Sequence, residues 1–334
     1  MSLATVGPTE QAAGIDPAVG GTAIQGRSPL RLSFDRLRQD RVAVISLAMI
    51  LLMVVLALAA PLVAALTGHG PIDANLDNGT DATGQPLAPG THGYVLGTDQ
   101  LGRDILVRIA YGAQISLLVG VVATLLAMVV GVVLGLLAGY YGGVIDSILG
   151  RLMDVVLSFP YILFAVALVS VFGASLTLTI LVIAFFSWAA IGRIVRGQAL
   201  SQREKEYVEA AHSMGASDMR IMFVDILPNL VAPVIVLGTL LIPVAIVFEA
   251  TLSYLGLGIT APTASWGNML SDAQGSGYGD WWFWFFPMLF LLLTTLGFNL
   301  LGDAVRDALD PRAERIFATK RKKAKVKKAK AAAV

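Results

Sequence analysis

The chain has 334 residues, of which 56% are hydrophobic and 14% are charged, and its mean hydropathy is +0.74. This composition is typical of a polytopic membrane protein and excludes a single soluble core. The net charge of +1 says little by itself, because basic residues in membrane proteins act through their position relative to the spans. The absence of cysteine excludes a disulfide framework, a thiolate nucleophile and a cysteine metal site, and the three histidines are too scattered to indicate a metal cluster.

The N-terminal segment, residues 1–30, is rich in Gly, Pro, Ala and Thr and lacks helical periodicity. It also lacks the basic-then-apolar pattern of a cleavable signal peptide, so we expect a disordered cytoplasmic tail. Residues 31–41 place Leu32, Phe34 and Leu37 among arginines. This pattern is typical either of an interfacial segment on the inner leaflet or of the charged flank of the first span.

Six apolar segments are long enough to cross a membrane, which takes about 20 residues each. We expect the spans at residues 42–66, 115–139, 152–172, 176–194, 230–249 and 281–302. The stretch from Val155 to Gly192 contains no charged residue and is too long for one ordinary crossing. We therefore divide it at residues 173–175.

Glycine spacing in the second span predicts a packing face. Gly131, Gly135 and Gly139 repeat every four residues and lie on one side of the predicted helix. Small residues on one face allow another backbone to approach closely, so we expect a second helix against this face.

The basic residues predict the orientation of the chain. With the N-terminus inside, only Arg103 and Arg108 of the 24 Lys and Arg residues lie outside, as the positive-inside rule requires. Both termini are then cytoplasmic, residues 195–229 form a cytoplasmic loop, and residues 67–114 and 257–280 are extracytoplasmic. The first of these outer segments is rich in Pro, Gly, Asn and Asp, so we expect an exposed loop with little regular structure.

A polar segment, EYVEAAHSMGASDMRIMFVDILPN at residues 206–229, interrupts the apolar runs. Its first part predicts a short helix with an apolar and a charged side, ended by Gly215 in the left-handed conformation, and a second helix follows. The small side chains of Ala210 and Ala211 would let a partner close over the backbone, as in a helix-in-groove contact. The alternative is a solvated amphipathic loop.

The stretch EAAHSMGASDMRIMFVDILP resembles the EAA motif of ABC-transporter permease subunits. The matching residues are Glu209, Ala210, Ala211, Gly215, Leu227 and Pro228. Asp225 occupies the Ile position of the pattern, with Ile226 beside it, which leaves the packing of the second helix open. The resemblance implies that this loop contacts an ATPase, with coupling residues Tyr207, Glu209, Ala210, Ala211, Met214 and Gly215.

Three more stretches resemble the second permease of the dipeptide, oligopeptide and nickel importers. They are LGTDQLGRDILVRIAYGAQISL (96–117), LGLGITAPTASWGNML (255–270) and LGDAVRDALDPR (301–312). The likeness covers residues 31–312 and implies an all-α, six-helix permease of a type I importer in a prokaryotic plasma (inner) membrane. It also implies three kinds of partner: a homologous permease, two ABC ATPase subunits and an extracytoplasmic solute-binding protein.

No Gly-Lys pair, and hence no phosphate-binding loop of the Gly-x-x-x-x-Gly-Lys type, occurs in the sequence. We therefore expect a non-catalytic subunit without a cofactor or metal of its own. The resemblance implies that ATP and Mg are bound by the partner ATPase subunits.

Glu249 is the one acidic residue well inside an apolar stretch. Intramembrane carboxylates are costly and make functional candidates, so we place Glu249, with Ser253 and Trp266, along the translocation path. The alternative is that Glu249 bonds to backbone groups of the irregular segment LSYLGLGITAP. Glycines and Pro262 break regular helix within residues 255–270, which predicts a re-entrant lid on the outer side.

The basic end, residues 313–334, includes KRKKAKVKKAK. Attraction to anionic membrane lipids explains it more simply than nucleic-acid binding, and a solvated tail that only fixes topology is simpler still. The rival function for the whole chain is an ion-coupled secondary transporter that uses Glu249 as its proton or cation site. That reading leaves residues 206–229 unexplained. The substrate stays open among dipeptides, oligopeptides, glutathione-like compounds and nickel chelates.

Overall fold

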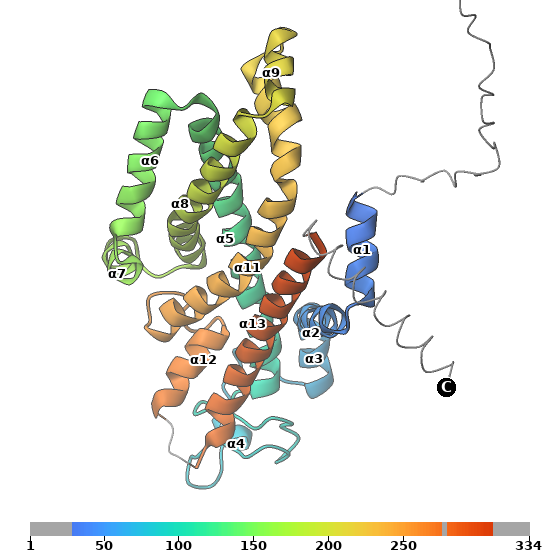
Figure 1. Ribbon diagram of the computed structural model, residues 1–334. Helices are drawn as coiled ribbons and strands as arrows, with labels where there is room; N and C mark the ends of the chain where they lie inside the picture. Colours follow the sequence, from blue (N-terminus) through green and yellow to red (C-terminus); the bar gives the residue numbers. More distant parts are fainter. Residues whose placement is uncertain (1–28, 276–278, 310–334) are drawn as a thin grey trace, which may run out of the picture.

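The computed structural model describes residues 29–275 and 279–309, and these form helices without a β-strand (Figure 1). The helices in chain order are α1 (Pro29–Gln39), α2 (Arg41–Leu58), α3 (Ala60–Thr67), α4 (Leu76–Gly79), α5 (Ile105–Tyr141), α6 (Gly143–Ser158), α7 (Tyr161–Phe172), α8 (Leu176–Arg203), α9 (Glu206–Ser213), α10 (Asp218–Arg220), a π-helical segment (Ile221–Ile226), α11 (Leu227–Tyr254), α12 (Trp266–Asp272) and α13 (Trp281–Leu309). The expected tail 313–334 and residues 1–28 of the expected tail 1–30 lie outside the described residues. Pro29 and Leu30 already belong to α1.

The all-α prediction is confirmed, with one change in the third span. Helices α2, α5, α8 and α13, and the continuous run Asp218–Tyr254, are each long and apolar enough to cross a membrane. The pair α6 and α7 makes a sixth crossing if it counts as one broken span, because it bends by 83°. Pro160 explains the break: it lacks an N–H and favours an extended conformation at Phe159, where φ is −78° and ψ is 131°. The third span, predicted at residues 152–172, therefore consists of parts of two helices that meet at a sharp bend.

Helix α5 begins earlier than expected, at Ile105 rather than at residue 115. Asp104 caps it, since the carboxylate accepts hydrogen bonds from the N–H groups of Leu106 and Val107. The first turn of α5 contains the charged residue Arg108. A search for uncharged runs therefore starts this helix too late. Residues 105–114 thus belong to a helix and not to the segment of little regular structure that was expected.

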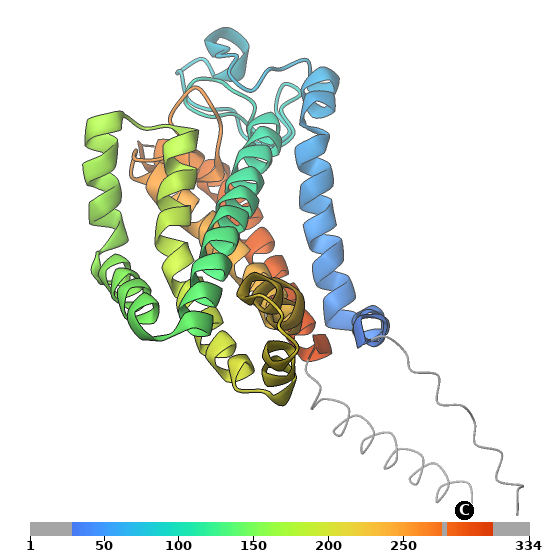
Figure 2. The same ribbon diagram turned by 90° about the horizontal axis from the view of Figure 1, so that it is seen from above.

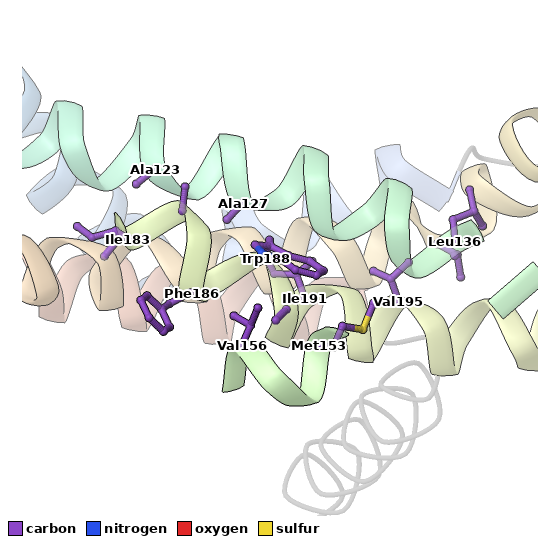
Figure 3. Packing of buried hydrophobic residues seen from close by; sticks show 14 of the residues in the cluster. Ala123, Ala127, Leu136, Met153, Val156, Ile183, Phe186, Trp188, Ile191 and Val195 are labelled. Atoms are coloured by element: carbon purple, nitrogen blue, oxygen red, sulfur yellow. The ribbon is translucent and has the colours of Figure 1, made fainter. Parts of the chain in front are cut away.

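The predicted glycine face packs against α8. A Cβ atom placed on Gly131, Gly135 or Gly139 would lie only 2.5 to 2.7 Å from the nearest atoms of α8. Larger side chains in this seam would therefore force the two backbones apart. Figure 3 shows side chains that fill the space beside the seam, from α5 (Ala123, Ala127, Leu136), α8 (Ile183, Phe186, Trp188, Ile191, Val195) and α6 (Met153, Val156). Helices α5 and α8 consequently form one closely packed pair.

The segments that interrupt the long helices gather at two opposite ends of the molecule (Figures 1 and 2). We call one the α9 end; it carries α9 and α10. The other, the α12 end, carries residues 68–104 and α12. Helix α13 packs against both α2 and α11 and so joins the first helices of the chain to the rest of the bundle.

Residues 68–104 contain little regular structure, as expected, but the expectation that they are simply exposed is wrong. Tyr94, Thr98, Asp99 and Asp104 are all buried. The Thr98 hydroxyl donates a hydrogen bond to the carbonyl of Gly79 at 2.7 Å, and similar local bonds hold the turns. The polar side chains of this segment are buried because they bond to residues elsewhere in the chain, such as Gly79 for Thr98, and composition does not reveal such bonds.

Candidate functional site

The loop at the α9 end has the predicted helix, corner and second helix. Helix α9 ends in a left-handed glycine, Gly215, with φ of +78°. The N–H of Ala216 donates to the carbonyl of Ala211 at 3.1 Å, and that of Gly215 donates to the carbonyl of His212 at 2.9 Å. These two bonds make a Schellman motif, which satisfies the last carbonyls of a helix. No atom lies within 4 Å of a Cβ built on Gly215, so the backbone conformation, and not the available space, requires glycine.

The faces of α9 differ from the prediction. Only Val208 and Ala211 of the expected apolar side are buried, where they join the main hydrophobic core. Tyr207 and Met214 stay exposed, with 38% and 81% of their surface accessible. Glu209 and Ala210 are exposed as well. The helix therefore anchors by two small side chains and presents an exposed mixed surface.

Tyr207 ties the loop to its two flanking helices. Its hydroxyl donates to Gln202 Oε1 in α8 at 3.1 Å and accepts from Asn229 Nδ2 in α11 at 3.4 Å. Partial burial raises the pKa of the Tyr207 hydroxyl above its ordinary value.

The second helix of the loop explains the departure from the EAA pattern. Residues 221–226 form a π-helical turn, in which the N–H of Leu227 donates to the carbonyl of Met222, five residues earlier. Pro228 has no N–H to offer to the preceding turn, and a wider turn accommodates its ring. Ile226 is buried in the core while Asp225 is only half-buried. Ile226 thus supplies the inward apolar contact that Asp225 cannot make.

The three residues assigned to the translocation path meet at one junction of α5, α11 and α12. Glu249 is completely buried, and its two carboxylate oxygens accept hydrogen bonds from Ser116 Oγ of α5 and Ser253 Oγ, both at 2.8 Å. Ser253 Oγ in turn accepts from the N–H of Ile259 at 2.9 Å. The indole of Trp266 donates to the carbonyl of Ile109 at 3.2 Å. Glu249 therefore bonds to the irregular segment through Ser253, close to the alternative given for it.

Burial decides what these residues can touch. Glu249 and Trp266 have no exposed surface and Ser253 has 1%. In this conformation they line no open path and contact only the chain itself. The assignment of these residues to the path rested on the acid in an apolar run, and no local pattern indicates that Ser116, 133 residues away, bonds to it.

Helix α12 begins within the segment that was expected to form a lid. Ser265 and Asn268 form a capping box at its start, with bonds of 3.0 and 3.2 Å. The Asn268 amide also donates to the carbonyls of Ile259 and Thr263. The turns before α12 are thereby fixed by one side chain, and the helix packs against α5, α11 and α13.

A buried ion cluster that was not predicted from the sequence joins residues 68–104 to α5 and α12. Asp99 Oδ2 accepts from Arg103 Nε at 2.6 Å and from Arg108 Nη1 at 3.0 Å. Asp272 Oδ2 accepts from Nη2 of the same two arginines at 3.1 and 3.2 Å. Asp99 and Arg108 are buried, while the Asp272 side chain is 37% accessible. The two arginines that were predicted to lie outside are thus neutralised in pairs.

Metal ligands are not grouped in residues 29–275 and 279–309: no set of three or more His, Asp and Glu side chains there is placed to hold an ion.

Comparison with known proteins identifies the family. Residues 131–315 match the binding-protein-dependent transport system inner membrane component family, and residues 28–89 match the N-terminal TM domain of oligopeptide transport permease C. The oligopeptide transport system permease protein OppC of Salmonella typhimurium is 43% identical over 86% of this chain and 93% of its own length.

Two other relatives are similarly close. The dipeptide transport system permease protein DppC of Alkalihalophilus pseudofirmus is 41% identical over 85% of this chain and 90% of its own length. The glutathione transport system permease protein GsiD of Escherichia coli O1:K1 / APEC is 40% identical over 86% and 92%. A solved chain of the MetNI methionine ABC transporter, in inward-facing conformations, matches with a TM-score of 0.50 over 61% of this chain and 96% of that chain. At 17% identity it shows the fold alone.

The EAA stretch, the helical architecture and these matches agree on an ABC-importer permease with several membrane-crossing helices. The chain belongs to the family of binding-protein-dependent transport system inner membrane components.

Proposed function

We propose that this chain forms half of the translocation pathway of an ATP-driven peptide importer and couples it to ATPase subunits through α9. The relatives named for oligopeptide, dipeptide and glutathione transport support the peptide class, since glutathione is itself a tripeptide. The chain has no phosphate-binding loop of its own, so ATP and Mg belong to its partners. Longer peptides and dipeptides fit this assignment equally well.

The exposed surface of α9 carries the proposal. Tyr207, Glu209, Ala210 and Met214 face outward at one tip of the molecule, and Met214 is among its most exposed apolar side chains. An accessible apolar residue beside a carboxylate on a short, firmly capped helix suits docking into a groove of a partner. Ala211 and Gly215 serve differently: Ala211 anchors the helix in the core, and Gly215 sets the corner.

The remaining partners and the placement follow from the same assignment. The chain pairs with a homologous permease above two ABC ATPase subunits, and an extracytoplasmic solute-binding protein delivers the peptide. Both termini and residues 195–229 are cytoplasmic, residues 67–114 and 257–280 are extracytoplasmic, and residues 31–312 form the permease domain. Glu249, Ser253 and Trp266 support the wall of the path from within the chain, without lining it in this conformation. Contacts outside the complex are with membrane lipids and not with nucleic acid.

The ion-coupled alternative predicts a carboxylate that ions can reach. Glu249 has no accessible surface and both of its oxygens are bonded within the chain, which argues against that role in this conformation. None of the three relatives compared above is named as an ion-coupled transporter. Uptake that survives loss of the membrane potential but stops on ATP depletion separates the two functions.

Copurification with the ATPases tests the docking role of α9. Glu209→Lys reverses a charge on the exposed face and should weaken ATPase retention about tenfold, as charge reversal at an interface does. The matched control is Glu204→Lys, an equally exposed glutamate that lies outside α9. A wild-type complex that contains no ATPase subunits would overturn the proposed function. Equal retention in both variants would overturn only the role given to Glu209.

Thiol labelling tests the orientation. Because the chain has no cysteine, single cysteines at Asp77 and Ser213 report without background. An impermeant reagent should label position 77 in intact cells and position 213 only after lysis. Both positions are exposed in the fold, so protection by packing does not interfere. Labelling of position 213 from outside would contradict the six-span orientation.

A further inference from the structure

A single hydroxyl group joins α5 to the loop at the α9 end. Tyr140 lies at the end of α5 and is buried, with 5% of its surface accessible. Its hydroxyl lies 2.8 Å from Asp218 Oδ1 and 3.0 Å from His212 Nε2. The Tyr140 and His212 rings are nearly parallel, with an angle of 7° between their planes. We call these three side chains the Tyr140 hub.

The proton positions in the hub follow from its donors and acceptors. An ionised Asp218 can only accept, so the Tyr140 hydroxyl donates its one proton to it. The hydroxyl oxygen then has lone pairs left, and His212 must donate its Nε2–H to it. Each contact thus has one donor and one acceptor, and the hydroxyl takes part in both. Removing it breaks both bonds at once.

The two partners of Tyr140 flank the corner of the loop. His212 is three residues before Gly215, and Asp218 is three residues after it. The Schellman motif holds the corner itself, and the hub attaches both of its sides to α5. A movement of α9 relative to α10 therefore has to displace Tyr140 or break its bonds.

Helix α5 is suited to carry such a displacement. It is one continuous helix of 37 residues, about 55 Å long at 1.5 Å per residue. Its glycine face is packed on α8 along its second half. At the other end of α5, Ser116 bonds to Glu249, and Arg108 belongs to the ion cluster with Asp99 and Asp272. The same helix thus touches the hub and both polar clusters near the α12 end.

We propose that Tyr140 is a positioning residue that fixes the α9 corner to α5, so that movement of the docked ATPase reaches α12 through α5. The first half of this proposal concerns the chain alone. The second half rests on the proposed function, because it needs an ATPase on α9. Two sites are coupled when both bias the same bistable element.

The restraint is tested on the full-length chain in lipid bilayers, without other proteins. A nitroxide on a cysteine at Ser213 reports the mobility of α9. Tyr140→Phe keeps the ring and its packing but removes both hydrogen bonds, and should increase nitroxide mobility. The matched control is Tyr141→Phe, whose hydroxyl makes no hydrogen bond to the described residues and which should change nothing. Equal mobility in the two variants would overturn the restraint.

A second pair of variants distinguishes the hub from general damage. Asp218→Asn keeps an oxygen that accepts from Tyr140 and should preserve low mobility, whereas Asp218→Ala should resemble Tyr140→Phe. Combining Tyr140→Phe with Asp218→Ala should add less than the sum of the single effects, because both remove the same bond. Full additivity would show that the two residues act separately, against the hub.

The transport half is tested on the assembled complex in liposomes with radiolabelled trialanine as the transported peptide. Tyr140→Phe should lower the number of peptides taken up per ATP hydrolysed by about 5- to 150-fold, the range that corresponds to two lost hydrogen bonds. The number of bound ATPases and the basal ATP hydrolysis should stay at the wild-type level. Increased nitroxide mobility with an unchanged peptide-to-ATP ratio would refute transmission through Tyr140. A wild-type complex without ATPases would instead refute the proposed function and leave the mobility result standing.

Discussion

The two ends of the molecule differ in the burial of their polar residues. At the α12 end, Asp99 and Arg108 are buried and bonded to each other, and Asp104 caps α5. At the α9 end, Glu209 and Met214 are exposed and only the supports of the loop are bonded. The α12 end is thus closed within one chain. At the α9 end, the exposed side chains of Glu209 and Met214 make no hydrogen bond or ion pair with the other described residues.

The difference separates residues that hold the fold from residues that are available to others. Buried ion pairs are expensive to break, because the remaining charge is left unpaired in a medium of low polarity. Exposed charges on a short helix contribute little to folding and are free to contact another protein. Changes at the α12 end should therefore act on stability, and changes on the face of α9 should act on assembly.

The largest effect is expected for Asp99→Ala. It leaves Arg103 and Arg108 with only the partly accessible Asp272, which should destabilise the chain by about 3 kcal/mol. The measurement is the thermal unfolding midpoint of the purified chain together with its yield from membranes. Asp77→Ala is the matched control, since Asp77 is an exposed acid of the same segment without a side-chain hydrogen bond to the described residues. An equal midpoint in both variants would mean that the α12 end is not held by its ion cluster.

The sequence predicted the parts of this comparison that depend on local patterns. The glycine spacing at Gly131 and Gly135 predicted a close helix contact, and α8 makes it. Gly215 predicted the corner, because short helices often end at a glycine with positive φ, and Gly215 has this conformation. The EAA spacing indicated the family, and the comparisons agree.

Features that depend on distant residues were not predictable in the same way. The partner of Arg108 on α12 is 164 residues away, and the partner of Tyr140 on α10 is 78 residues away. Neither pair leaves a periodic trace in the sequence. The break at Pro160 carried a local signal, but the uncharged run from Val155 hid it. The predicted six crossings match the five long apolar helices together with the bent pair α6 and α7 when that pair counts as one span, but the bend itself was not predicted.

A smaller effect, confined to the α9 end, is expected for Gly215→Val. A β-branched residue at φ of +78° is strained by an order of 1–3 kcal/mol, although there is room for its side chain. The corner should distort and ATPase retention should fall while the chain still inserts and pairs. Gly215→Asn is the matched control, because asparagine tolerates the left-handed conformation and should keep most of the retention. Equal retention in both variants would show that the corner geometry is unimportant for docking.

The smallest effect is expected for substitution of Glu249, which is fully buried. If this residue only fixes the junction of α5, α11 and α12, Glu249→Gln should be tolerated. Glutamine keeps the size and one accepting oxygen, and both hydrogen-bond partners of Glu249 are neutral hydroxyl groups. The expected loss of stability is about 1 kcal/mol, that of one hydrogen bond, and peptide uptake should persist at a changed rate.

Glu249→Leu is the informative companion, because it leaves the hydroxyl of Ser116 without its acceptor and should cost more stability than glutamine does. Thermal unfolding gives the order of the two variants, and uptake with ATP hydrolysis gives their function. Loss of uptake in Glu249→Gln, with normal assembly and normal ATP hydrolysis, would contradict the structural role and favour an ion-binding carboxylate in its place.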